Sequence, residues 1–388
     1  MKSITTARDL AINGAQPRFS EPLHVGRPHV ANRDGFLRTT QEILDRLWLT
    51  NNGPVVQELE RRVADHHQVK HCVAMSSGTL GLEIAIRALQ LEGEVILPSH
   101  TYVATAHALH WHGLTPVFAD IDPATHNIDP ESVRGLITER TSAIIGVHLW
   151  GRIAPVDQLE RLARAQGLKL LYDAAHAFGC SCEGVKVGNF GDCEILSFHA
   201  TKFFHTLEGG AVLTNQDSLA EQLRLMRNFG FAGVDQVVCA GTNGKLNEIS
   251  AAMGLANLDA LPSLLAHNRQ VYSAYRDALA EVPGLSMLKL DESQDSNYQY
   301  VVLETDPDCR LERDQIIEAL HAENILARRY FWPGCHRMMP YRELIPGAGR
   351  HLSRTEQIVE RIIVMPAGYA VTPEMVPEIV GVLRTLMD

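Results

Sequence analysis

The sequence predicts an α/β protein: a mostly parallel β-sheet covered on both faces by helices, followed by a smaller α+β domain. Between residues 70 and 215, short apolar runs rich in β-branched residues alternate with longer segments of helical periodicity, the pattern of α/β domains. The apolar runs are nearly continuous, as expected for strands buried on both faces of a parallel sheet. After about residue 256 the pattern changes. We therefore expect an N-terminal segment at 1–50, a large α/β domain at 51–256 and a small α+β domain at 257–388.

The large domain is expected to begin with a short strand at 73–75 and a helix at 78–91. Further strands are expected at 94–97, 116–119, 143–149 and 168–172, with helices such as 104–111 and 156–165 between several of them. Strands at 194–198 and 211–214 should flank a loop, and a helix should begin near Ser218. Later helices are expected at 249–256, 261–280, 313–323 and from about Pro373, with a strand at 298–304.

Composition limits the classes of function. The 388 residues are 45% hydrophobic and 21% charged, as in ordinary soluble globular proteins. The 35 basic and 46 acidic side chains give a formal charge of -11 without a basic block, so nucleic acid is not an expected partner. No apolar run approaches the roughly 18 residues of a membrane span, and none near the N-terminus suits a signal peptide. We expect no membrane association and a cytoplasmic location.

The seven cysteines are scattered along the chain, unlike the dense framework of a small secreted domain. We expect them to be reduced. The pair Cys180 and Cys182 lacks the two-residue spacer and the second ligand pair of a zinc site, so no metal is expected.

A carboxylate and a histidine follow one predicted strand closely. In KLLYDAAHAFG, Asp173 and His176 lie just past the carboxyl end of an apolar run, and this edge of an open α/β sheet is where ligands bind. A carboxylate there could pair with a protonated ring nitrogen, which is how enzymes that use pyridoxal phosphate (PLP) keep the ring able to accept electrons. The alternative is that Asp173 caps a following helix.

Lys202 lies in SFHATK, among residues that are mostly apolar or small. Burial favours the neutral form of a lysine, and the neutral amine is the form that attacks an aldehyde. A solvent-exposed lysine is the alternative for this segment alone. Asp173 precedes the segment, however, and the pair Gly209 and Gly210 follows it, which together favour a cofactor-linked lysine.

A possible phosphate-binding turn lies at 76–79, SSGT, between a predicted strand and a predicted helix. Backbone N–H groups at a helix N-terminus bind phosphate well, although serine and glycine also begin many helices simply as caps. Neither GxGxxG nor GxxxxGK[ST] accompanies this turn, which disfavours a nucleotide-dependent oxidoreductase.

Taken together, KLLYDAAHAFG, SFHATKFFHTLEGGAV and SSGTLGLEIAIRAL resemble the DegT-type family of PLP-dependent sugar-nucleotide aminotransferases. The resemblance extends from about Arg38 to the C-terminus. It implies fold type I, the aspartate-aminotransferase-like fold, with PLP bound in the large domain at 51–256. It also implies homodimers, or dimers of dimers, with each active site at a subunit interface.

The resemblance also implies roles for individual residues. Lys202 is similar to the family's Schiff-base lysine, and Asp173 to the partner of the ring nitrogen. Ser197 and the turn Gly78-Thr79 are similar to the residues that bind the cofactor phosphate. Some relatives carry histidine in place of the lysine and perform dehydration, so the lysine here favours transamination.

Further contacts follow from the same resemblance. Tyr102 is similar to the aromatic residue that stacks on the cofactor ring, and His176 to the contact of the ring hydroxyl. Asn243 resembles an asparagine that the neighbouring subunit supplies; alternatively, it caps a turn before the helix at 249–256. Substrate contacts are expected from three residues in more variable segments: Lys245, Arg329 and Tyr330.

Within the family, the segments WLTNNGP, SFHATKFF, FGF and RRYFWP most resemble enzymes that make dTDP-4-amino-4,6-dideoxyglucose. This implies transfer of an amino group from L-glutamate to a 4-keto-6-deoxy sugar nucleotide. A 3-keto sugar nucleotide or an inosose is an alternative acceptor, and a noncatalytic regulator with the PLP fold is an alternative class of protein.

Overall fold

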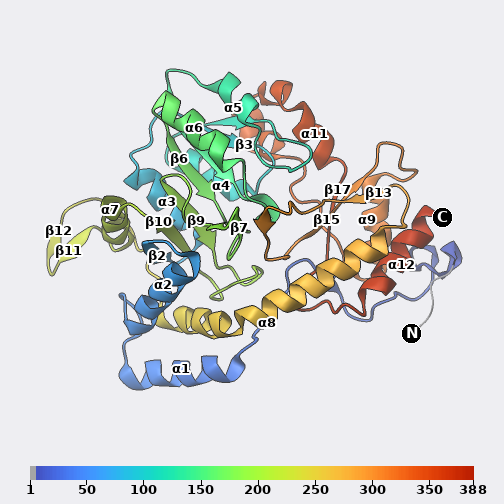
Figure 1. Ribbon diagram of the computed structural model, residues 1–388, viewed down its shortest axis with the longest axis horizontal. Coiled ribbons are helices and arrows are strands. Elements are labelled where there is room, and N and C mark those ends of the chain that lie inside the picture. The colour runs from blue at the N-terminus through green and yellow to red at the C-terminus, as the bar shows by residue number, and fades with distance from the viewer. Residues whose placement is uncertain (1–5) are drawn as a thin grey trace.

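The computed structural model describes residues 6–388 and is built around a seven-stranded sheet with the order β2-β10-β9-β6-β5-β3-β4 (Figure 1). β10 runs antiparallel to β2 and β9, and the remaining neighbours are parallel. The predicted mostly parallel sheet is therefore confirmed. Its strands are β2 (His71–Met75), β3 (Glu94–Pro98), β4 (Thr115–Ala119), β5 (Thr141–Val147), β6 (Lys169–Asp173), β9 (Cys193–Ser197) and β10 (Gly210–Thr214).

Helices cover both faces of this sheet. Strands β3 and β10 are buried along their whole length, which explains their continuous apolar sequences. On one face, the sheet shares a hydrophobic core with α3 (Gly78–Ala88), α4 (Val103–Trp111) and α7 (Asp217–Arg227). On the other, it packs against α2 (Pro54–His67), α5 (Pro130–Leu136), α6 (Val156–Gln166) and the first half of α8 (Glu248–Leu279).

Helix α8 joins two segments that the sequence predicted as separate helices. It runs without interruption through Pro262, so the expected domain boundary between residues 256 and 257 lies inside it. Its first half contacts α1 (Arg33–Arg46) and α2, and its second half contacts α12 (Val376–Met387) (Figure 1). By length and composition α8 could cross a membrane, but 56% of its apolar stretch is buried inside the protein. Packing within the fold therefore accounts for its hydrophobicity.

The C-terminal region has its own core. A three-stranded antiparallel sheet, with the order β13-β15-β17, shares that core with α9 and α12. The N-terminal segment joins this region because β1 (Leu23–His24) pairs in parallel with β16 (Ile325–Leu326). The bounds of these elements are β13 (Leu285–Met287), β15 (Val301–Thr305), β17 (Ile362–Met365) and α9 (Arg313–Ala322). α10 (Tyr341–Leu344) packs instead into the core of the seven-stranded sheet through Tyr341, and α11 (Ser353–Val359) packs into a separate cluster through Ile358.

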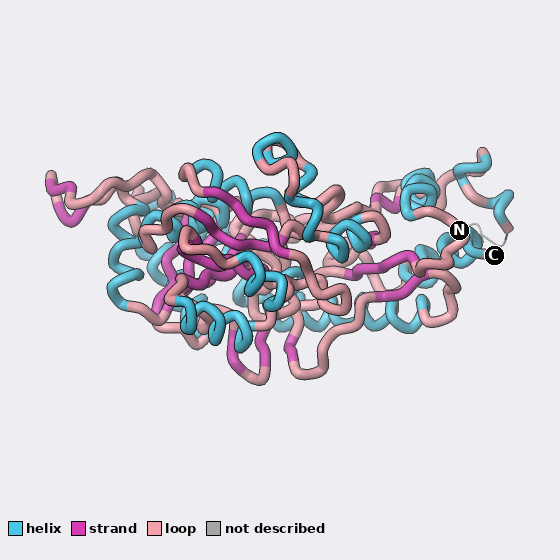
Figure 2. Tube along the Cα trace, turned by 90° about the horizontal axis from the view of Figure 1, so that it is seen from above, coloured by secondary structure: helices cyan, strands magenta, loops and turns pink. Residues whose placement is uncertain are grey.

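Two small β-structures lie outside the cores. β14 (Gln294–Asp295) pairs with β7 (Ser181–Cys182), which pairs with β8 (Val185–Lys186). The hairpin of β11 (Phe231–Gly233) and β12 (Gln236–Val237) projects from the end of the protein opposite the termini (Figures 1 and 2). Short 3-10 helices lie at Ala7–Asp9, Ala11–Asn13, Leu149–Gly151, Cys335–Arg337 and Ala348–His351.

Several predicted boundaries differ from the structure. The strand expected at 143–149 ends at Val147, because a 3-10 turn begins at Leu149 and Trp150 has a left-handed φ of 62°. The sequence did not predict α1 or α2. Only Ile43 of α1 is buried, so this helix lacks the broad apolar stripe from which helices are recognised.

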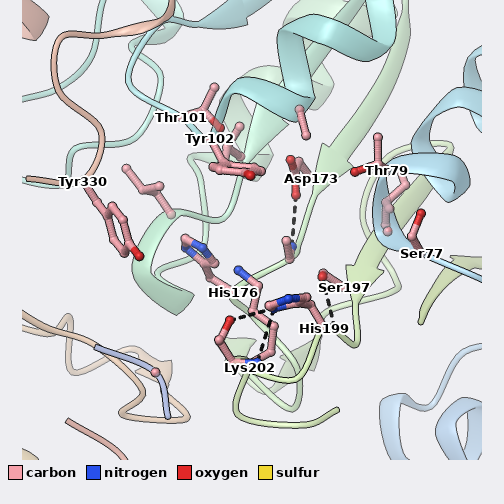
Figure 3. A pocket seen from close by; sticks show the side chains of 18 of the residues that line it. Ser77, Thr79, Thr101, Tyr102, Asp173, His176, Ser197, His199, Lys202 and Tyr330 are labelled. Carbon is pink, nitrogen blue, oxygen red and sulfur yellow. Dashed lines mark hydrogen bonds between the residues drawn. The ribbon is translucent and has the colours of Figure 1, made fainter. Parts of the chain in front are cut away.

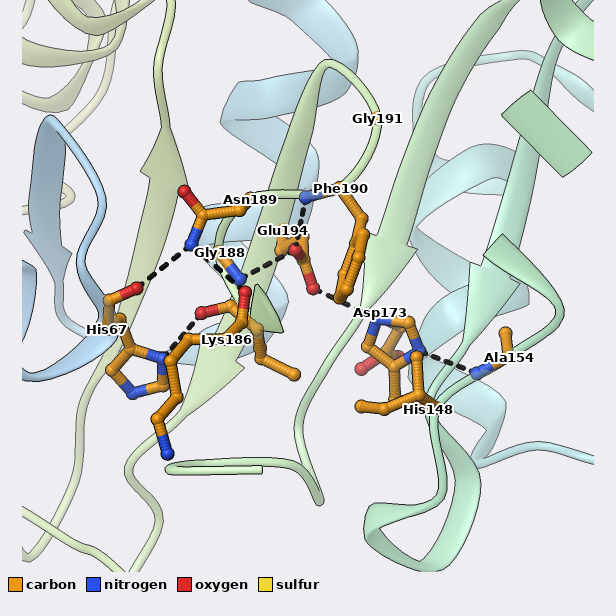
Figure 4. A network of polar contacts seen from close by, with 12 residues as sticks. His67, His148, Ala154, Asp173, Lys186, Gly188, Asn189, Phe190, Gly191 and Glu194 are labelled. Atoms are coloured by element: carbon orange, nitrogen blue, oxygen red, sulfur yellow. Dashed lines mark hydrogen bonds and ion pairs between the residues drawn. The ribbon is translucent and has the colours of Figure 1, made fainter. Parts of the chain in front are cut away.

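A buried carboxylate stabilises the centre of the sheet. Glu194 of β9 has no solvent exposure, and its Oε1 accepts hydrogen bonds from the N–H groups of Gly188 (2.6 Å) and Phe190 (2.8 Å). Its Oε2 lies 2.9 Å from Nε2 of His148 (Figure 4). Because Nδ1 of His148 accepts the N–H of Ala154 at 3.0 Å, the neutral ring carries its proton on Nε2 and donates it to Glu194. Three hydrogen bonds therefore compensate for the burial of this charge.

We predict that Glu194→Ala lowers the free energy of unfolding by about 3 kcal/mol or more, because it leaves three buried donors without an acceptor. Chemical denaturation measures the loss. The matched control is Glu221→Ala on the exposed face of α7, which should change stability by less than about 0.5 kcal/mol. Equal stability of the two variants would contradict this interpretation of the network.

Candidate active site

A cavity of about 450 Å³ lies at the carboxyl ends of β6 and β9. The structure brings together there most of the residues that the sequence singled out, from five separate parts of the chain (Figure 3). These residues are Gly78, Thr79, Tyr102, Asp173, His176, Ser197, Lys202 and Tyr330.

Lys202 lies in the loop between β9 and β10, where its backbone N–H donates to the carbonyl of His199 at 2.9 Å. Its side chain faces the cavity, and its amine is enclosed. Burial lowers the pKa of Lys202 to about 8, although the negative charge of Asp173 opposes this shift. About a tenth of the amine is therefore neutral at pH 7, against less than about a thousandth for a lysine of ordinary pKa, and the neutral form is the nucleophile.

Asp173 ends β6 with its carboxylate directed into the cavity. Its Oδ1 accepts the N–H of Ala175 at 3.1 Å, and its Oδ2 accepts the hydroxyl of Thr105 at 2.8 Å. Residues 174–180 form turns rather than a helix, so Asp173 does not cap a helix as the alternative proposed. Its hydrogen bonds instead fix the orientation of the carboxylate within the cavity.

His176 is buried beside aromatic rings, with Trp150 stacked at 5.8 Å and Tyr300 at 4.5 Å between ring centroids. Burial lowers its pKa well below the ordinary value, and the positive charge of Lys202 lowers it further. The backbone N–H of Trp150 donates to Nδ1 of His176 at 3.3 Å. The neutral ring of His176 therefore carries its proton on Nε2. His176 is therefore a hydrogen-bond donor at this nitrogen.

The first turn of α3 lines the side of the cavity away from Tyr330 (Figure 3). Oγ of Ser77 accepts the N–H of Leu80 at 3.1 Å and caps the helix, whereas the N–H groups of Gly78 and Thr79 have no acceptor within the helix. A Cβ on Gly78 would lie only 3.0 Å from Cβ of Ser197, so glycine allows the serine to approach the helix end. The free N–H groups, the helix dipole and the hydroxyl of Ser197 together have the chemistry that suits an anion.

Tyr102 immediately precedes α4 and lines the cavity. The residue is 59% exposed, and the centroid of its ring lies 6.0 Å from that of Phe331. An exposed aromatic face at this position is available to stack on a planar ligand.

Two of the predicted residues, Asn243 and Lys245, lie outside the cavity of their own chain. Asn243 forms a β-bridge with Asn228, and Nζ of Lys245 donates to Oδ1 of Asn228 at 3.1 Å. The cap of α8 is a different asparagine, Asn247, whose Oδ1 accepts the N–H of Ser250 at 2.8 Å.

Arg329 is also outside the cavity. Its Nε pairs with Oδ1 of Asp314 at 3.0 Å, whereas the preceding residue, Arg328, lines the cavity and lies 5.3 Å from the ring of Tyr330. The predicted arginine, Arg329, thus lies next to the cavity rather than in its lining.

The sequence analysis missed several residues of the site. Thr105 binds Asp173 from α4, and Val25 and Gly26 line the cavity from the N-terminal segment. The pairing of β1 with β16 helps to bring Val25 there, and nothing in the local sequence indicates that pairing. Tyr300 and Phe331 were hidden among other apolar residues of the C-terminal region.

An enclosed lysine amine, a carboxylate at a strand end and an anion site at a helix N-terminus define the site of a fold type I PLP-dependent transferase. The chain belongs to the DegT/DnrJ/EryC1/StrS aminotransferase family, whose model matches residues 31–384. It is a sugar aminotransferase, and the aminotransferases of this family are PLP-dependent. The predicted fold type, family and class of enzyme are thus confirmed.

Among characterised relatives, the chain is 34% identical to dTDP-4-amino-4,6-dideoxy-D-glucose transaminase of Escherichia coli over 362 residues, 92% of this chain and 97% of that protein. It is 36% identical to GDP-perosamine synthase of Caulobacter vibrioides over 309 residues, 78% of this chain and 83% of that protein. Among solved structures, DesI with its TDP-sugar product has a TM-score of 0.92 and 44% identity, covering 97% of this chain and 96% of DesI.

We predict that Lys202 captures added PLP at a rate that rises with pH through about 8 and then levels off. Only the neutral amine attacks the aldehyde, and the lowered pKa makes that form dominant above pH 8. Apo-protein mixed with PLP across a pH series is reduced with borohydride and digested, and the modified peptide is quantified by mass spectrometry.

Lys202→Ala is the blank for this measurement and should yield no modified peptide from the segment. Modification of another lysine with Lys202 untouched would show that the assignment is wrong. So would a rate that rises only near pH 10.4, the usual pKa of lysine.

Proposed function

We propose that this enzyme transfers the amino group of L-glutamate to a 4-keto-6-deoxy sugar nucleotide, giving dTDP-4-amino-4,6-dideoxyglucose, with PLP held by Lys202. The main structural support is the lowered pKa of Lys202 in a cavity that also contains Asp173 and an anion site. The acceptor is inferred from the E. coli relative and from DesI, whose names specify a 4-amino-4,6-dideoxy sugar and a TDP-sugar product. A 3-keto sugar nucleotide or an inosose is the alternative acceptor.

The side chains of the cavity fit PLP. The N–H groups of Gly78 and Thr79 and the hydroxyl of Ser197 suit its phosphate, because glycine leaves room for the close approach of helix and strand. Asp173 would face the ring nitrogen, and Nε2–H of His176 would donate to the ring hydroxyl. When bound, PLP supplies an electron sink for the carbon that loses a proton.

Lys202 then acts as both acid and base. Once the amine of glutamate has displaced Nζ from the cofactor, Nζ would move the proton of the glutamate α-carbon to the cofactor carbon that carries the nitrogen. In the second half-reaction it would move a proton from that carbon to the sugar carbon that receives the amino group. A pKa of about 8 allows the same amine to accept and to donate protons near neutral pH. The carboxylate of Asp173 would face the ring nitrogen and favour its protonated form. Tyr102 covers one side of the cavity.

Charged groups of the substrates require a cation at the cavity. We assign this role to Arg328, which lines the cavity, and expect Tyr330 beside it to contact the sugar. Arg329 would have to leave Asp314 before it could reach a substrate.

We also propose a homodimer, or a dimer of dimers, in which Asn243 and Lys245 reach the cavity of the partner subunit. Asn243 is exposed and lies outside its own cavity. The nearby hairpin exposes apolar side chains, among them Phe231 and Val237, which a second subunit would cover.

A cytoplasmic location fits the proposed function. The characterised relatives act in the synthesis of nucleotide-linked sugars, as their names state. The hydrophobicity of α8, the one helix among residues 6–388 that is long and apolar enough for a membrane span, is explained by its packing.

We predict that nitrogen from 15N-labelled L-glutamate appears in a dTDP-4-keto-6-deoxy sugar. The kcat/KM for this 4-keto sugar should exceed the kcat/KM for a dTDP-3-keto-6-deoxy sugar and for an inosose by about 10-fold or more. A few substrate contacts provide discrimination of this size. Mass spectrometry of each product measures the label. Preferred amination of the 3-keto sugar or the inosose would contradict the proposed substrate, and labelled L-alanine outperforming glutamate would contradict the proposed donor.

We predict that mixing Lys202→Ala subunits with Asn243→Ala subunits restores activity above either parent alone. If Asn243 serves the partner's cavity, each hybrid dimer contains one site with both defects and one intact site. If Asn243 serves only its own chain, each hybrid site has one defect and no intact site forms.

The control is a mixture of two differently tagged Lys202→Ala proteins, which should remain inactive. Hybrids are isolated by their two tags, and the Asn243→Ala parent must be clearly impaired on its own. Isolated hybrids without recovered activity would exclude the shared site.

A further inference from the structure

A glutamine from the C-terminal region holds the backbone on both sides of Lys202. Gln299 is buried just before β15, and its Oε1 accepts the N–H of Phe203 at 3.1 Å. Its Nε2 donates to the carbonyl of Thr201 at 2.9 Å. These two residues flank Lys202, so one side chain fixes the peptide groups that precede and follow the lysine.

Asn297 makes similar contacts to the backbone at His176. Its Nδ2 donates to the carbonyls of His176 (2.9 Å) and Phe178 (3.2 Å). Its Oδ1 accepts the backbone N–H of Gln299 at 3.1 Å, which links the side chain of Asn297 to the backbone of Gln299. We call Asn297 and Gln299 together the clip, because they bind the backbone at two residues of the cavity.

The backbone between the two side chains is itself firmly held. Tyr298 has a left-handed φ of 54°, a conformation that bulky residues rarely adopt. Its N–H donates to Oγ of Ser296 at 3.0 Å, and Asn268 of α8 donates to the carbonyl of Asn297 at 3.1 Å. The unusual turn thus presents the clip in a fixed orientation relative to α8.

We propose that the clip positions Lys202 and His176 for chemistry, and that Gln299 is the residue on which the placement of the Lys202 amine depends. This inference rests on the proposed function of the cavity. The loop from β9 to β10 has no helix or strand around Lys202, and a lysine side chain is long and flexible. The position of Nζ therefore depends on external contacts to the loop backbone, and Gln299 supplies two of them.

A second glutamine in the same segment provides a matched control. Oε1 of Gln294 accepts the N–H of Ile153 at 2.8 Å, and its Nε2 donates to the carbonyl of Ile153 at 3.4 Å. Gln294 therefore also binds a distant backbone segment through both ends of its amide, but Ile153 does not line the cavity. Removing its amide tests the structural contribution of such contacts without affecting Lys202.

The test compares Gln299→Met with Gln294→Met, since methionine keeps the length of glutamine and removes both hydrogen bonds. We expect comparable decreases in Tm for the two apo-proteins. The rate at which Lys202 captures added PLP, measured by borohydride trapping, should fall about 10-fold or more in Gln299→Met and stay within about 2-fold of wild type in Gln294→Met. Gln299→Glu keeps an acceptor for Phe203 and should give an intermediate rate, and it is the variant to use if Gln299→Met does not fold.

Capture at the wild-type rate by Gln299→Met, with a lowered Tm, would overturn the positioning role and leave Lys202 as the cofactor-binding lysine. Equal slowing in Gln294→Met would also overturn it, because a general structural effect would then explain the loss. Failure of the wild-type protein itself to capture PLP on Lys202 would instead refute the proposed function of the cavity.

Discussion

The close approach of helix α3 to strands β9 and β10 determines where this active site can form. A Cβ at Gly210 would lie 2.4 Å from the backbone nitrogen of Gly78, and a Cβ at Gly78 would lie 3.0 Å from Cβ of Ser197. Larger residues at either glycine would force the helix end away from the sheet and separate its free N–H groups from the serine. The glycines therefore bring the free N–H groups of α3 next to Ser197, and the loop that carries Lys202 leaves the sheet beside them.

Burial then changes the chemistry of the groups around this point. It makes Lys202 a weaker base and keeps His176 neutral, so the cavity combines a nucleophilic amine with a neutral hydrogen-bond donor. Hydrogen bonds hold the surrounding polar groups in place. Thr105 and Ala175 orient Asp173, and the backbone N–H of His148 donates to the carbonyl of Asp173 at 2.9 Å. The buried pair of Glu194 and His148 stabilises the same sheet (Figure 4).

The sequence could predict the features that depend on local pattern. Asp173 and Lys202 lie near the ends of apolar strands, so their meeting at one sheet edge followed from the fold class and from the family resemblance. Features that depend on packing between distant segments could not be predicted: Gln299 is 96 and 98 residues from its two backbone partners. Adjacent residues were also ambiguous, because only the structure shows which of Arg328 and Arg329 faces the cavity.

A crystal structure of the protein with PLP, refined without an imposed covalent link, tests the central claim most directly. We predict continuous electron density from Nζ of Lys202 to the cofactor, the ring nitrogen within hydrogen-bonding distance of Asp173, and the phosphate at Gly78 and Ser197. A cofactor bound through another lysine, or bound in the cavity with its phosphate away from the N-terminus of α3, would contradict the account.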